Sequence, residues 1–252
     1  MIYITGDCHA EWGRFSAENF TEQKDITRDD YVIVCGDFGI WDDSKRERWW
    51  LDWFAKKSFT ILFCDGNHEN FDQLNSYEVV DFHGGKAHKI RENVYHLMRG
   101  YIFDLCGKKF FVFGGAQSHD IQDGVLDVKD YPSRKAMIRD YEYRTYFLGQ
   151  MLRINNESWW EQELPTNEEM EFGMATLNAH DNKVDYIVSH CCPQEIASLM
   201  SGGFYKPDKL TMFFDKVAET TKFSKWFFGH YHDDQQYLSQ YVMLYKQIIR
   251  IA

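Results

Sequence analysis

The chain has 252 residues, of which 44% are hydrophobic and 17% aromatic, and its formal net charge at pH 7 is -11. This length and composition are typical of a folded protein with a large core and exclude a mostly disordered chain. The negative charge disfavours nucleic acid as a partner, because a broad basic surface is needed to neutralise many phosphates. A small anionic substrate remains compatible if bound metal cations supply local positive charge.

Short apolar runs of strand length recur along the chain, and each ends at a polar residue or a glycine. They lie at residues 2–5, 31–35, 59–64, 110–115, 184–189 and 225–229. Between the second and third runs, residues 42–57 carry tryptophans at helical spacing, which predicts a helix. Alternation of strands and helices indicates an α/β layered fold, and the nearly continuous apolar runs favour strands covered on both faces.

The stretch from about residue 118 to residue 182 is more polar and richer in predicted helix than the rest. One helix is predicted over 134–152, and a second begins at Thr166, where Glu169 completes a capping-box pattern. No linker-like segment or internal repeat divides the chain. We therefore predict one domain over residues 1–252, with a helical insertion or cap at about 118–182.

The cysteines and the hydropathy of the chain indicate where in the cell the protein is expected to be. The six cysteines show no CxxC spacing or disulfide framework, which favours reduced thiols. The first residues do not resemble a signal peptide, and no apolar run approaches the roughly 20 residues that cross a bilayer. The sequence thus predicts a cytoplasmic protein without a membrane partner.

Five of the six apolar runs are followed directly by residues that bind metals or transfer protons. The carboxyl ends of parallel strands converge at one edge of an open α/β sheet, so these side chains should meet if their strands share a sheet. Imidazole and carboxylate groups together favour first-row divalent ions over a thiolate site, and the number of ligands favours two ions. The residues are Asp7, His9, Asp37, Asn67, His68, His190, His230 and His232.

These residues form five motifs in a fixed order: D-C-H at 7–9, G-D-F-G at 36–39, G-N-H-E at 66–69, His190, and G-H-Y-H at 229–232. Each motif alone occurs by chance in many chains, but the ordered set is specific. With it, the chain resembles the calcineurin-like metallophosphoesterases, including their bacterial and phage-type members. The resemblance extends from Asp7 to His232. One departure is Ala10, where the family often has glycine.

The resemblance implies a four-layer α/β/β/α sandwich with two mixed sheets and a dinuclear centre at the strand ends. It implies two divalent ions, with Mn²⁺ expected first and Fe, Zn, Ni or Mg as alternatives. By the same resemblance, His230 and His232 bind different ions. The implied ligands are Asp7, His9 and His232 for one ion and Asn67, His190 and His230 for the other, with Asp37 bridging the two.

The resemblance also implies a reaction, the hydrolysis of a phosphate mono- or diester by a metal-bound hydroxide. His68 and Asp37 are the expected catalytic residues, and a histidine at this position can protonate the leaving oxygen. A small phosphorylated molecule or a nucleotide is the expected substrate. The alternative is a non-catalytic binding scaffold with the same fold, which we would expect to lack some ligands or His68.

Three further residues are candidates for substrate binding. Arg14 could pair with a phosphate oxygen through its planar guanidinium, or lie on the surface of a helix. Ser118 and His119 belong to a G-G-A-Q-S-H loop that resembles one in a bacterial and phage subset of the family, where S-W-W-E follows later, as here at 158–161. His119 could contact substrate or be structural. Trp159 and Trp160 fit core packing better than stacking on a ligand.

Overall fold

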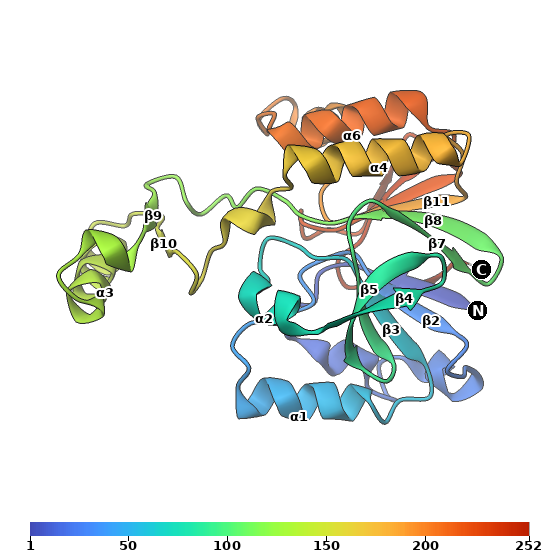
Figure 1. Cartoon of the computed structure of the whole chain (residues 1–252), viewed down its shortest axis with the longest axis horizontal. Helices are drawn as coiled ribbons and strands as arrows, with labels where there is room; N and C mark the ends of the chain where they lie inside the picture. The colour runs from blue at the N-terminus through green and yellow to red at the C-terminus, as the bar shows by residue number, and fades with distance from the viewer. Residues whose placement is uncertain (252) are drawn as a thin grey trace.

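The computed structural model describes residues 1–251 and contains two large mixed β-sheets packed face to face (Figure 1). The central strands of the first sheet, β1, β2, β3 and β6, are parallel, and the others are antiparallel. In spatial order the strands are β15 (Ile249–Arg250), β1 (Ile2–Thr5), β2 (Tyr31–Val34), β3 (Thr60–Phe63), β6 (Val94–Leu97), β5 (Gly85–Arg91) and β4 (Glu78–Phe82).

The second sheet has four parallel strands, β14, β12, β11 and β8, and antiparallel strands at both edges. In spatial order they are β13 (Gln235–Tyr237), β14 (Tyr241–Met243), β12 (Lys225–Phe228), β11 (Tyr186–Ser189), β8 (Lys108–Phe113) and β7 (Tyr101–Leu105). The six apolar runs predicted from the sequence are therefore strands, but they divide equally between two sheets.

Helices cover the outer face of each sheet, which gives four layers (Figure 1). Helix α1 lies against the first sheet, and α4, α5 and α6 lie against the second. Alternate residues of one strand serve different layers, since Tyr3 packs in the α1 layer and Ile4 between the sheets. The helices are α1 (Lys45–Phe54), α2 (Phe71–Ser76), α3 (Arg134–Glu142), α4 (Asn167–Ala179), α5 (Gln194–Ser201) and α6 (Lys209–Thr220).

Local sequence explains where the helices begin and end. The predicted capping box is confirmed: Thr166 and Glu169 exchange side-chain and backbone hydrogen bonds at the start of α4. The predicted helix over 134–152 is too long. Helix α3 passes into one π-helical turn at Tyr143–Phe147, and Gly149 then adopts a φ of +67°, which ends the helical path.

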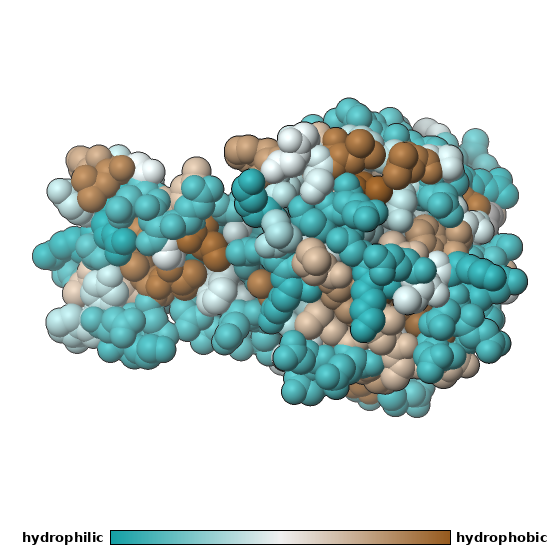
Figure 2. Space-filling view, turned by 90° about the horizontal axis from the view of Figure 1, so that it is seen from above, coloured by the Kyte–Doolittle hydropathy of each residue, from teal (hydrophilic) through white to brown (hydrophobic). Residues whose placement is uncertain are grey.

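The segment expected as an insertion has two parts that pack differently. Residues 121–157, here called the lobe, include α3 and the small sheet of β9 (Val125–Leu126) and β10 (Arg153–Ile154), and they project from the main body (Figures 1 and 2). The lobe has a small core of its own, formed by Leu126, Met137, Leu152 and Ile154. Helix α4 instead lies on the second sheet, where Gly173 lets Phe111 and Phe113 approach closely. None of the helices in residues 1–251 is long and apolar enough to span a membrane.

Candidate metal centre

The loops after the central strands bring the predicted ligands to one end of the sandwich in strained backbone conformations. Four of them adopt positive φ: His9 (+46°), Asp37 (+46°), His230 (+68°) and His232 (+54°). A non-glycine residue at positive φ costs roughly 1–2 kcal/mol, and such residues gather at functional sites. Ala10, the departure from the family pattern, also has a positive φ of +58°, a conformation that glycine adopts more readily.

Glycines beside the ligands allow the loops to approach each other. A Cβ atom on Gly66 would lie 2.0 Å from Oδ1 of Asp37, and one on Gly229 would lie 1.9 Å from Oδ1 of Asp7. Both distances are far shorter than a van der Waals contact. The glycines of the G-N-H-E and G-H-Y-H motifs are therefore required by the packing of the two carboxylates.

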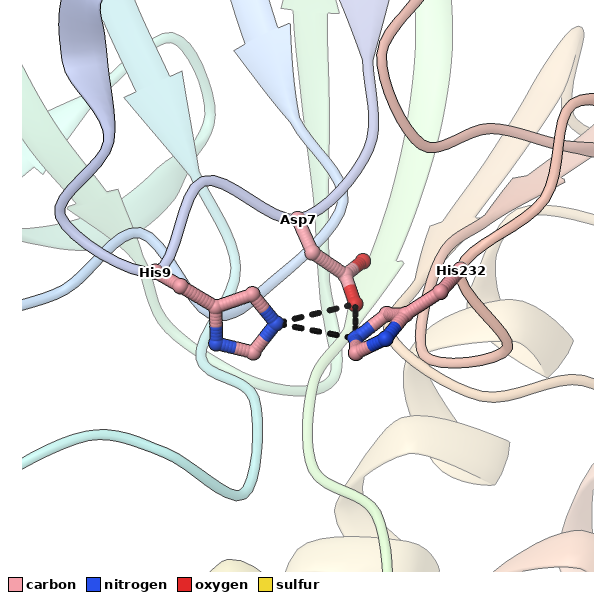
Figure 3. A group of neighbouring side chains, drawn as sticks. All are labelled: Asp7, His9 and His232. Atoms are coloured by element: carbon pink, nitrogen blue, oxygen red, sulfur yellow. Dashed lines mark hydrogen bonds and ion pairs between the residues drawn. The ribbon is translucent and has the colours of Figure 1, made fainter.

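Asp7, His9 and His232 form one group of candidate ligands (Figure 3). Oδ2 of Asp7 lies 3.2 Å from Nε2 of His232 and 3.6 Å from Nε2 of His9, and the two imidazole nitrogens are 2.9 Å apart. The carboxylate is fully buried, whereas His232 is half exposed. These three side chains point toward one another from the loops after β1 and β12, although His232 is more than 220 residues from the other two in the chain.

Asp7, Asp37 and His190 form a second group of candidate ligands, and Asn67 adjoins it. Nε2 of His190 lies 3.3 Å from Oδ2 of Asp37 and 3.1 Å from Oδ1 of Asn67. The other ring nitrogen, Nδ1, lies 2.8 Å from the carbonyl oxygen of Cys35, a contact that orients Nε2 toward the centre. Oδ2 of Asp37 is also 3.7 Å from Nδ1 of His9, so this oxygen lies between the two groups.

His230 faces away from His232, although one residue separates them in the chain. Its Nε2 lies 2.9 Å from Nε2 of His119, and its ring is 5.0 Å from that of His190. Its backbone N–H donates to both oxygens of Asp7. The structure thus brings His119, a predicted substrate-binding residue, beside the predicted ligand His230.

The centre combines buried carboxylates with imidazoles that stabilise their charge. Burial alone would raise the pKa of Asp7, but the charge of His190 and a hydrogen bond from His232 hold it well below its usual value. Burial likewise opposes ionisation of Asp37, while His190 lowers its pKa. Burial acts to lower the pKa of His190, yet Asp37 and Asp7 raise it to about 10. Buried anions beside inward-pointing imidazoles are the donor set that divalent cations bind.

His68 lies at the rim of this centre, and its backbone is fixed on both sides. Its N–H donates to Oδ1 of Asp37 at 2.8 Å, and its carbonyl accepts from the indole N–H of Trp41 at 2.5 Å. Burial lowers the pKa of the His68 imidazole, and Asp37 opposes that effect. The next residue, Glu69, is buried and accepts hydrogen bonds from the N–H groups of Phe38 and Ile40. Glu69 therefore holds the loop that carries Asp37, a role that sequence reasoning missed.

A second missed residue, Glu163, acts through Ser118. The hydroxyl of Ser118 accepts from Nδ2 of Asn67 at 3.1 Å and donates to Oε2 of Glu163 at 2.5 Å, while the Ser118 N–H donates to Oε1 at 2.9 Å. Burial raises the pKa of Glu163 to about 7, although the hydrogen bonds from Ser118 favour its ionised form. The S-W-W-E signal pointed to Glu161, which is exposed, whereas Glu163 is 1% exposed.

Arg14, a predicted phosphate contact, donates to backbone carbonyls in this structure. Its guanidinium donates to the backbone carbonyls of Asp7, at 2.6 Å, and of Tyr245, and to the hydroxyl of Thr5 at 3.1 Å. These acceptors lie behind the Asp7 loop, so Arg14 joins that loop to the C-terminal segment. Sequence spacing placed Arg14 near the first motif, but it could not show which backbone carbonyls the guanidinium satisfies.

Of the pockets that adjoin the centre, two are lined by a predicted catalytic or substrate-binding residue. One, of about 470 Å³, is lined by residues that include His9, Trp41, His68, Arg153 and Trp160. The other, of about 740 Å³, is lined by residues that include Ser118, His119, Tyr205, His230 and Tyr231.

A match to a protein-family model identifies the class of this protein. The family model described as calcineurin-like phosphoesterase matches residues 1–234, and the chain belongs to that family. In general terms the protein is a metal-dependent phosphoesterase. A solved structure of phosphopantetheinyl hydrolase from Mycobacterium tuberculosis is similar with a TM-score of 0.42 and 17% identity, over 97% of this chain and 89% of that one. A comparison with curated protein sequences finds no match.

Proposed function

We propose that the protein hydrolyses a phosphate ester at a dinuclear centre formed by the two groups of ligands. Asp7, His9 and His232 would hold one divalent ion, and Asn67, His190 and His230 the other. Asp37 would contact both. The observation that carries this proposal is the position of Oδ2 of Asp37, which lies 3.3 Å from a ring nitrogen of His190 and 3.7 Å from one of His9.

The side chains divide the work of the reaction. Two divalent cations held by these residues would lower the pKa of a water molecule and would offset the charge of the phosphoryl oxygens. His68 lines the adjoining pocket and would donate a ring proton to the oxygen of the leaving alcohol. Glu69 and Glu163 contact neither ion in this scheme, and they hold the Asp37 loop and the Asn67 amide in place. Mn²⁺ is the first candidate, and Fe, Zn, Ni and Mg are alternatives that such ligands also accept.

The complete ligand set favours an enzyme over the alternative of a non-catalytic scaffold. A scaffold does not require a histidine held beside the centre, nor does it require the strained backbone at four ligands. The expected substrate is a small phosphorylated molecule. The acidic net charge of -11 weighs against long nucleic acids.

The proposal is tested with purified protein, depleted of metal and then loaded with Mn²⁺, on 4-nitrophenyl phosphate and bis(4-nitrophenyl) phosphate. We expect metal-dependent turnover of at least one ester. Asp37→Asn should weaken metal binding in calorimetry and reduce turnover, while His68→Ala should reduce turnover and retain both ions. The protein loaded with each of the five candidate metals would then be assayed. If it binds two ions stoichiometrically but hydrolyses neither ester with any of these metals, the non-catalytic scaffold would be favoured.

A further inference from the structure

Two of the pockets that adjoin the metal centre have no described lining residue in common. One pocket includes His9 and His68, whereas the other includes His119 and His230. Each pocket therefore begins at a different half of the proposed dinuclear centre. A substrate with its phosphorus at the centre can extend one substituent into each pocket.

The pocket beside His68 is suited to the leaving group. Trp41 is 40% exposed, and the hydrogen bond from its indole N–H to the His68 carbonyl fixes the ring next to the proton donor. Trp160, which is 6% exposed, also lines this pocket, and its indole N–H donates a hydrogen bond to Oδ2 of Asp72 at 2.9 Å. Arg153 reaches in from the lobe, held by a hydrogen bond from its Nε to Asp120 at 2.8 Å. Fixed aromatic faces bind planar or apolar groups at a small entropic cost.

The pocket beside His230 has an aromatic wall of its own. His119 and Tyr205 are stacked, with ring centres 5.7 Å apart and an angle of 25° between the planes. Tyr205 also contacts Tyr231, whose ring lies 5.2 Å away. Lys206 and Gln194 also line this pocket, whose volume is about 740 Å³. This is more space than the nonbridging oxygens of a phosphoryl group require, so the pocket is suited to a second organic substituent.

We propose that the substrate is a phosphodiester with two bulky organic substituents, an inference that rests on the proposed function. The leaving alcohol lies against Trp41, and the retained substituent lies along His119 and Tyr205. A water oxygen forms the new bond to phosphorus, and the bond to the leaving oxygen breaks. That oxygen takes a proton from His68, and the water proton passes to solvent. The products are an alcohol and a phosphomonoester that retains the group beside Tyr205.

Three chromogenic esters distinguish the two pockets, because all release 4-nitrophenol. They are 4-nitrophenyl phosphate, methyl 4-nitrophenyl phosphate and bis(4-nitrophenyl) phosphate. The first is a monoester, the second is a diester with a minimal second group, and the third is a diester with an aromatic second group. The quantity of interest is the ratio of kcat/KM for the bis ester to that for the methyl ester. Comparing this ratio between variants cancels the difference in intrinsic reactivity.

We expect wild type to prefer the diesters to the monoester. Tyr205→Ala should lower the bis-to-methyl ratio about tenfold, the size of effect that one aromatic stacking contact provides. Trp41→Ala should lower kcat/KM for both diesters by a similar factor and leave their ratio within about twofold. The matched controls are Tyr146→Ala and Trp49→Ala, since these aromatic residues are 79% and 59% exposed and line neither pocket.

Two outcomes would overturn the inference while the proposed function stands. One is a higher kcat/KM for the monoester than for either diester, and the other is an unchanged bis-to-methyl ratio in Tyr205→Ala. If no ester is turned over, the binding affinities of two unreactive diesters test the inference instead. Diphenyl phosphate should then bind the Mn²⁺-loaded protein more tightly than methyl phenyl phosphate, and Tyr205→Ala should remove the difference. Equal binding of the two by wild type would refute the second pocket.

Discussion

Replacement of Glu163 by glutamine tests how the Asn67 ligand is oriented. A carboxylate at this position accepts both the N–H and the O–H of Ser118. The Ser118 oxygen can then accept only from the NH₂ group of Asn67, which turns the amide oxygen toward His190. Glutamine replaces one of these two acceptor oxygens with an NH₂ group, which only donates, so it cannot accept the two bonds at separate atoms as the carboxylate does. Glu163→Gln should therefore permit the wrong orientation of Asn67, whose nitrogen cannot bind a metal ion.

The size and pH dependence of the effect follow from the burial of Glu163. Loss of an interaction that orients a metal ligand typically costs 10–100-fold in metal affinity. Because the pKa of Glu163 is raised to about 7, wild type carries the required carboxylate above that pH and a neutral acid below it. A neutral carboxylic acid resembles a glutamine amide, because each has both a hydrogen-bond donor and an acceptor. The variant should thus bind one of two ions about 10–100-fold more weakly at pH 8 and within about threefold of wild type at pH 6.

Stability should change in the opposite direction to metal affinity. A pKa raised from 4.5 to about 7 means that ionising Glu163 in the metal-free fold costs about 3 kcal/mol. The stabilising contribution of the neutral form is full below pH 4.5 and is lost as the pH rises through 7. Metal-free Glu163→Gln retains a neutral group, so at pH 8 it should unfold at a temperature no lower than wild type does.

Calorimetric titration of metal-free protein with Mn²⁺ at pH 6 and pH 8, together with thermal unfolding, measures both effects. The control is Glu161→Gln, which changes an exposed carboxylate in the same short helical turn. Equal Mn²⁺ affinity of wild type and variant at pH 8 would refute the proposed orientation of Asn67. A loss of both sites together with a lower unfolding temperature would show that Glu163 acts only by supporting the fold.

His68→Ala should reduce kcat/KM about 10²–10⁴-fold for phenyl esters but less for 4-nitrophenyl esters, because a good leaving group needs little protonation; an equal loss for both would contradict a proton-donating role. Gly66→Ala should abolish stoichiometric metal binding, because its Cβ would lie 2.0 Å from Oδ1 of Asp37, whereas Gly13→Ala meets no atom within 4 Å and serves as the control. Removing metal with a chelator should lower the unfolding temperature by several degrees. At a free metal concentration of about 100 times Kd, a bound ion stabilises the fold by about 2.7 kcal/mol, and the chelator removes this stabilisation. The chelator should lower the unfolding temperature of Asp37→Asn by less than that of wild type. An equal decrease in both proteins would argue that the ions bind elsewhere.

The sequence alone determined six of the strands, the ordered motifs and the family, because these depend on local signals. Each of these six strands is a short apolar run that ends at a glycine or a polar residue, and the capping box at Thr166 is complete within four residues. Local signals failed where chain reversal competes with helix propensity, as at Gly149, which ends the helical path of the lobe early.

Only the tertiary structure decided which side chains support the ligands and where a substrate fits. The six predicted strands lie in two sheets, so the ligands meet across the sandwich. Glu163 contacts Ser118 from 45 residues away, and no periodicity or motif reports such a contact. The guanidinium of Arg14 likewise donates to the carbonyls of Asp7 and Tyr245, because backbone carbonyls removed from water require hydrogen-bond donors. The sequence does not show which donor a given carbonyl will have. One pocket forms where loops of the first sheet meet the end of the lobe, and the other where loops of the second sheet meet the segment that enters the lobe, so each is lined by residues distant in sequence.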